Sequence, residues 1–227
     1  MTGGLDSAGD LDEALRAFAF VEPVSEHTRL TLGPHLPASV RDLWDRGVGY
    51  LGDGYWRTVD PVHIAAAVSQ LADPIHASYS FPVLTSAFGD VLTCWHSRLY
   101  LINSRFGRYC GLGRADHLGA AIADLTGPDR EFLTGPAPWA QAATELGIPG
   151  PYECFAYVPP LAARPLGNPE APANPANPDN PANPANPANP ANPANLELSD
   201  LTGLVRTGLA AHLRFLAEFS GRVQGRF

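Results

Sequence analysis

The chain has 227 residues, enough for one substantial core or two small ones, and its 45% apolar and 17% charged residues are typical of a globular protein. The chain has 15 basic residues, all of them arginines, and 23 acidic residues, which gives a formal charge of −8. This acidic balance argues against a nucleic-acid groove, which needs a net basic surface, and is compatible with a basic protein partner.

The first third of the chain is predicted to be mostly helical after a flexible segment over residues 1–9. The expected elements, in order, are a helix over 10–20, a helix from Pro37 to Gly47, a strand over 55–59 and a helix over 60–71. Asp60 and Pro61 suit the cap and first turn of the last of these helices. Asp53, within Gly-Asp-Gly, is interpreted as a turn residue.

From Phe81 to Leu112 the apolar residues alternate with a period of two, interrupted by the short segments GD, HS and SRFG. This pattern predicts an antiparallel meander of about four strands. Two helices are expected next, in RADHLGAAIADL and APWAQAATELG, followed by a strand or extended segment in PYECFAYVPPL. A helix is expected from Ser199 to about Phe219. We therefore predict an α+β fold: an antiparallel sheet of about four to six strands flanked by helices, with a long C-terminal helix.

Residues 167–195 are dominated by an Asn-Pro repeat. Each proline lacks a backbone donor and disfavours helix at the preceding residue, so the repeat can join neither a sheet nor a helix. We expect a disordered, exposed insert that acts as a semi-rigid spacer. A recognition role for a polyproline helix is the alternative.

Cys154, beside Glu153 in PYECFAYVPPL, is the main candidate for a catalytic nucleophile. A thiolate would need a base, and the histidine that follows it in the chain, His212, lies on an apolar helix face. We therefore interpret Cys154, like Cys94 and Cys110, as a reduced and buried packing residue. A cysteine-dependent hydrolase stays as a minor hypothesis.

Other chemistry has little support in the sequence. The seven histidines show no i, i+4 pair, and neither a Walker nor a G-x-S-x-G motif occurs, so we expect no metal, no cofactor and no enzymatic activity. The first residues lack the basic start and apolar core of a signal peptide, and no segment approaches the ~20 apolar residues of a membrane span. A cytoplasmic protein without membrane or nucleic-acid contacts is expected.

The chain as a whole resembles the bacterial immunity proteins that combine a GAD-like domain with a C-terminal type VI secretion immunity domain. The resemblance covers most of residues 10–220 outside the repeat and is carried by LPASVRDLWDRGVGYLGDGYWRTVDP, SAFGDVLTCW, WAQAATELGIPGPYECFAYVPPLA and AAHLRFLAEF. It implies a GAD-like α+β domain over 10–125 and an immunity-type domain over 128–227 packed against it. In the C-terminal part the matching positions are Trp139, Leu146, Gly147, Glu153, Phe155, Pro159, Leu161, His212 and Leu213.

What the resemblance implies is a protein without catalytic activity that binds and neutralises a cognate secreted toxin, a nuclease effector, by masking or distorting its active site. We take Glu153, Tyr152 and Asp53 as candidate toxin contacts; Tyr152 stands where the family carries an acid. Glu153 has two possible roles, an ion pair with an arginine of this chain or a contact with the toxin's basic cleft. The alternative function is an intracellular adaptor that uses the proline-rich spacer.

Overall fold

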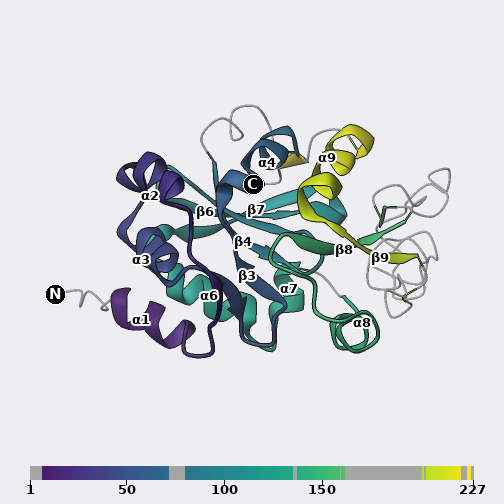
Figure 1. Cartoon of the computed structure of the whole chain (residues 1–227), viewed down its shortest axis with the longest axis horizontal. Helices are drawn as coiled ribbons and strands as arrows, with labels where there is room; N and C mark the ends of the chain where they lie inside the picture. The colour runs from purple at the N-terminus through teal and green to yellow at the C-terminus, as the bar shows by residue number, and fades with distance from the viewer. Residues whose placement is uncertain are drawn as a thin grey trace, which may run out of the picture.

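One large sheet forms the centre of the molecule (Figure 1). The computed structural model describes residues 7–71, 80–134, 137–158, 160–161, 201, 203–220 and 224–225. In these ranges eight strands pair in the order β1-β2-β3-β4-β5-β6-β7-β10, all antiparallel except for β10 against β7. The strands are β1 (Ala19–Glu22), β2 (Val48–Leu51), β3 (Trp56–Thr58), β4 (Phe81–Ser86), β5 (Val91–Trp95), β6 (Arg98–Asn103), β7 (Arg108–Arg114) and β10 (Gln224–Gly225).

Helices connect and cover these strands. The α-helices are α1 (Ser7–Ala14), α2 (Glu26–Leu32), α3 (Ala38–Arg46), α4 (Ala65–Leu71), α6 (Leu118–Thr126), α7 (Arg130–Thr134), α8 (Trp139–Leu146) and α9 (Leu209–Ser220). Short 3-10 turns are η1 (Gly33–His35), η2 (Pro61–His63), η3 (Ser104–Phe106) and η4 (Ala115–His117). None of the helices in the described ranges has the length and apolar character needed to span a bilayer.

The sheet is buried on both faces. Successive side chains of a strand point to opposite faces, and in the central strands they enter different cores. Leu92 and Leu101 pack in the core that includes residues of α1, α3, α6 and α8, whereas Val91 and Ile102 pack with residues of α4 and α9. Figure 1 shows α4 and α9 together at the top of the molecule and α1, α3 and α6 on its left and lower side. Helices therefore cover both faces.

A second, two-stranded sheet consists of β8 (Glu153–Tyr157) and β9 (Leu204–Gly208). It joins the main sheet where the amide of Phe155 donates to the carbonyl of Ala87 at 2.7 Å. The Phe155 ring lies 5.6 Å from Phe88 and 6.4 Å from Trp139 between centroids. Residues from both expected domains thus share one core.

The predicted α+β class is confirmed, with an antiparallel sheet, flanking helices and a C-terminal helix. The expected meander over 81–112 is β4 to β7, and its HS turn places His96 and Ser97 at φ of 48° and 59°, as a tight hairpin requires. The predicted helices around 37–47, 60–71, 115–126 and 139–146 also occur. Asp60 caps its helical turn as expected, because its Oδ1 accepts from the Val62 amide at 3.1 Å.

Three expectations need correction. The helix predicted over 10–20 occupies Ser7–Ala14, so it begins inside the segment expected to be flexible and ends before β1. The C-terminal helix predicted from Ser199 begins at Leu209, because residues 204–208 pair with β8 as β9 and this long-range pairing overrides the helical pattern. The main sheet also extends beyond four to six strands through β1, β2 and β10. The Asn-Pro repeat lies outside the described residues.

Candidate functional site

Glu153, the first predicted toxin contact, is held by groups of this chain. Its Oε2 accepts from Nε of Arg206, on the neighbouring strand β9, and from the Gly150 amide, each at 2.8 Å. The hydrogen bond from Arg206 is the main reason why the pKa of the Glu153 carboxyl is lowered. The Glu153 and Arg206 side chains remain 40% and 43% exposed. The structure thus gives Glu153 the ion-pair role, at a half-exposed position.

Tyr152, the second predicted contact, is half-buried beside the C-terminal helix. Its ring lies 4.4 Å from the His63 ring between centroids, and its carbonyl accepts from the Leu209 amide at 2.8 Å. Burial raises the pKa of the phenol, and the Glu22 side chain raises it further. Tyr152 therefore connects η2 to the start of α9, while its side chain is only partly accessible.

Asp53, the third predicted contact, occupies the turn between β2 and β3 as expected. One carboxylate oxygen accepts from the Tyr55 amide at 3.0 Å, and the other pairs with Nη1 of Arg130 at 2.8 Å. The Arg130 guanidinium also lies 4.4 Å above the Tyr55 ring. Asp53 thereby fixes the first residue of α7 to the sheet, a link between residues distant in sequence that the turn motif did not indicate.

Cys154 and His212 do not form a nucleophile and base in this structure. Cys154 is fully buried, and burial raises the pKa of its thiol to about 12. His212 is also buried, and burial lowers its pKa to about 4, so the imidazole is neutral near pH 7. Its ring lies instead against Gly89, where an added Cβ would come within 3.1 Å of the His212 Cδ2. Both side chains serve as packing groups.

We find no candidate metal site in the part of the chain that the structure describes. Within those ranges, histidine, cysteine, aspartate and glutamate residues form no group of three with the placement a metal ion needs.

A buried arginine that sequence reasoning missed holds β8 to the main sheet. Arg57, on β3, is fully buried, and burial lowers its pKa to about 10. Its guanidinium donates to the carbonyls of Ser86 at 3.1 Å and Pro149 at 3.5 Å, and to the carbonyl of Glu153. The signal in the sequence is a charged residue inside the otherwise apolar segment YWRTV. Arg57 is structural, because its partners are backbone atoms.

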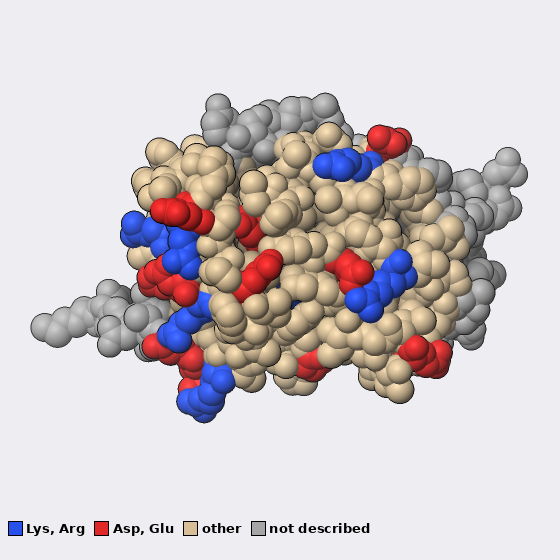
Figure 2. All heavy atoms as spheres, viewed as in Figure 1, with Lys and Arg blue, Asp and Glu red and all other residues tan. Residues whose placement is uncertain are grey.

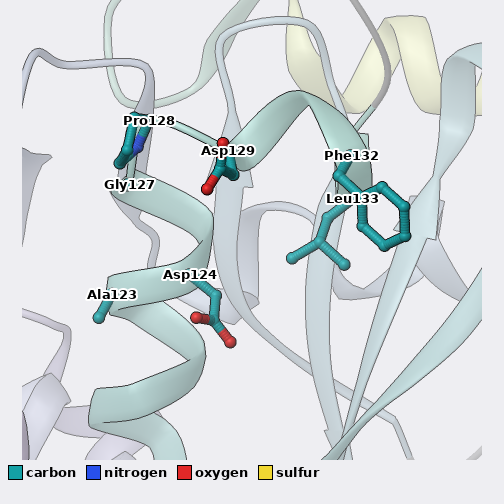
Figure 3. A pocket seen from close by; sticks show the side chains of 7 residues that line it. All are labelled: Ala123, Asp124, Gly127, Pro128, Asp129, Phe132 and Leu133. Carbon is teal, nitrogen blue, oxygen red and sulfur yellow. The ribbon is translucent and has the colours of Figure 1, made fainter.

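An open hollow of about 610 Å³ lies between α6 and α7. Its lining residues are Ala123, Asp124, Gly127, Pro128, Asp129, Phe132 and Leu133. Figure 3 shows the side chains of Asp124, Asp129 and Leu133 turned toward the space between the two helices, with the Phe132 ring at the far rim. We call this feature the α6–α7 hollow.

Phe132 is the most exposed of the large apolar side chains in the described chain, at 90%. Aromatic side chains that enter a partner's surface are common anchors of protein interfaces, and Phe132 stands at the edge of a concave surface. The sequence offered no indication of this exposure, because a single phenylalanine in REFLT has no periodic context.

Helix α7, which carries Phe132, is fixed at both ends despite its short length. Arg130 holds its start through Asp53 and Tyr55, as described above. At its end, the Thr134 carbonyl accepts from Arg105 Nη2 at 2.6 Å and from Asn103 Nδ2 at 2.7 Å. The rim of the α6–α7 hollow is therefore positioned before any partner arrives.

Charges on the face seen in Figure 2 are mixed in sign. Acidic and basic side chains alternate at its left edge, over the region of α1 to α3, while the broad centre carries few charges. Ion pairs such as Arg46–Asp12 and Arg29–Asp45 account for part of this mixing. This face therefore presents no large single-sign surface.

Comparison with known proteins informs the fold alone. No family model matches the chain, and no match was found among curated proteins. The crystal structure of Atu4351 from Agrobacterium tumefaciens is similar, with a TM-score of 0.63 and 15% sequence identity over 92% of this chain and 88% of that one. The two proteins share a fold across nearly their whole length.

Proposed function

We propose that this protein is a cytoplasmic immunity protein that binds a cognate secreted toxin, a nuclease effector, and neutralises it by masking or distorting its active site. The sequence resemblance described above motivates the toxin and its class. The single structural observation that carries a binding role is Phe132, 90% exposed at the rim of the α6–α7 hollow.

The charge of the chain suits such a partner. A nuclease needs a basic cleft to hold DNA phosphates, and a protein with a formal charge of −8 is attracted to such a surface. Electrostatic attraction raises the association rate, and apolar contacts then slow dissociation. The α6–α7 hollow has both acidic groups (Asp124 and Asp129) and apolar groups (Phe132 and Leu133) in its lining.

Co-expression tests this function. The product of the gene encoded beside this one, expressed alone in a naive host, should arrest growth and degrade DNA, and co-expression of this chain should restore both growth and intact DNA. A purified 1:1 mixture should show DNA cleavage suppressed in proportion to complex formed. Growth arrest that persists despite equal expression of this chain would refute the proposal.

A shortened chain separates immunity from the adaptor hypothesis. If the Asn-Pro repeat is a spacer, removal of residues 174–195 should leave protection at the wild-type level. Loss of protection in a variant that still folds would favour a role for the repeat in binding.

A further inference from the structure

We propose that the α6–α7 hollow is the contact surface for the toxin and that it receives a lysine- or arginine-bearing segment of that toxin. This inference rests on the proposed function and adds the location and chemistry of the contact. The hollow would bind the cation with Asp124 and Asp129 and its aliphatic stem with Phe132 and Leu133.

The acids of the α6–α7 hollow are available to a partner. Asp124 and Asp129 line the hollow, and Glu131 lies beside them on α7; all three are exposed, and none forms an ion pair with another described residue. Arg130 lies among them in sequence, but its guanidinium is directed to Asp53 at 2.8 Å. Among the residues that the structure describes, none pairs with these acids, so the hollow has an excess of negative charge.

The apolar part of the surface suits the same occupant. Lysine and arginine carry three or four methylene groups below their charge, and these pack on apolar side chains while the charge reaches a polar rim. A cation can also lie over the face of an exposed aromatic ring. The carboxylates of Asp124 and Asp129, turned toward the space between the two helices in Figure 3, and the Phe132 ring at its far rim provide these contacts together.

Other occupants fit this charge pattern less well. A nucleic acid would place its phosphates against the carboxylates of Asp124 and Asp129, which is repulsive. A second copy of this chain in a two-fold arrangement would place the same acids against one another. A basic segment of a different protein neutralises them.

The rigid position of α7 favours tight binding. Ordering a loop on association costs free energy, which is avoided when the contact residues are already fixed. The contacts of Arg130 and Thr134 at the two ends of α7 provide this preorganisation. Phe132 can therefore act as an anchor although its helix has only five residues.

Isothermal titration with the purified product of the adjacent gene tests the surface. Phe132→Ala and the double variant Asp124→Lys/Asp129→Lys change exposed side chains, so both should keep the wild-type melting temperature. We expect the dissociation constant to rise about tenfold or more for Phe132→Ala and by a larger factor for the charge reversal. Raising NaCl from about 50 to 500 mM should weaken wild-type binding and have less effect on the charge-reversed variant.

Matched controls lie on other helices. Leu30→Ala removes an exposed apolar side chain of α2, 69% exposed, and Asp42→Lys reverses an exposed acid of α3. Both should bind within about twofold of wild type, as expected for substitutions outside a contact surface. Wild-type binding that the hollow variants leave unchanged would overturn the location while keeping the proposed function. Absence of wild-type binding would overturn both.

Discussion

Arg105 joins the buried core to the end of α7, the helix at the rim of the α6–α7 hollow, through the 2.6 Å hydrogen bond from its Nη2 to the carbonyl of Thr134. The same Nη2 lies 2.9 Å from Oδ2 of Asp90, and both side chains are almost completely buried. Burial alone would lower the pKa of Arg105, but Asp90, together with Tyr55 and Tyr157, outweighs burial and the pKa is raised. The end of the helix that carries Phe132 is thus fixed by a charged core residue.

Removal of Asp90 should be strongly destabilising. Asp90→Ala leaves the Arg105 guanidinium buried without its counter-charge, and we expect the free energy of unfolding to fall by about 3 to 5 kcal/mol. Urea titration followed by tryptophan fluorescence measures this change. The control is Asp116→Asn in the exposed pair with Arg114, which should cost about 0 to 1 kcal/mol. Equal, small effects of the two substitutions would contradict a structural role for the buried pair.

Elements with strong local periodicity could be predicted from the sequence. The strands β4 to β7 alternate apolar residues over several positions and are joined by tight turns, so local pattern and final pairing agree. The short strands β1 and β2 offer too few positions for a pattern, and their pairing joins Ala19 to Tyr50. Strand β9 is likewise defined by partners such as Cys154, which pairs with Thr207.

The candidate site was harder to predict for a related reason. Asp90 and Arg105 lie in the segments GD and SRFG, which sequence reasoning assigned to turns between strands and which the fold brings together in the core. Likewise, the Asp53 turn was recognised, but its pairing with Arg130 was not. Exposure of Phe132 depends on how α7 packs, which no local pattern encodes.

Chemical modification tests the packing role of Cys154. Because burial raises the pKa of this thiol to about 12, it should remain unmodified by iodoacetamide at about pH 8 while the chain is folded. Cys110 is only half-buried and should react first. Mass spectrometry of the labelled peptides distinguishes the two, and all three cysteines should react after unfolding in urea. Rapid labelling of Cys154 in the folded chain would restore the cysteine-dependent hypothesis.

His212 should make stability depend on pH below neutrality. Its pKa is about 4 in the folded chain, below the value of about 6.5 for a histidine in water, because burial disfavours the charged imidazole. As pH falls from about 6.5 to about 4, the unfolded chain binds a proton that the folded chain does not, so the free energy of unfolding decreases. We expect a loss on the order of 2 kcal/mol from this residue across that window.

The matched variant for this effect is His212→Gln, which keeps a polar side chain of similar size but does not titrate. Urea unfolding of both proteins at several pH values between about 4.5 and 7 isolates the histidine, because carboxylates contribute to both curves alike. As pH decreases, the wild type should lose more of its unfolding free energy than the variant does. A difference independent of pH would contradict a buried, neutral His212.

Glu153 allows the two roles considered for it to be separated by experiment. Its pair with Arg206 is about 40% exposed, so Glu153→Gln should change the free energy of unfolding by less than about 1 kcal/mol. Because the carboxylate already accepts from Arg206 and from the Gly150 amide, we expect toxin affinity to change by less than about twofold. The double variant Glu153→Gln/Arg206→Gln removes both charges of the pair. It should bind the toxin with the same affinity as Glu153→Gln. A tenfold loss of affinity in Glu153→Gln that the double variant does not restore would instead identify Glu153 as a direct toxin contact, in addition to the α6–α7 hollow.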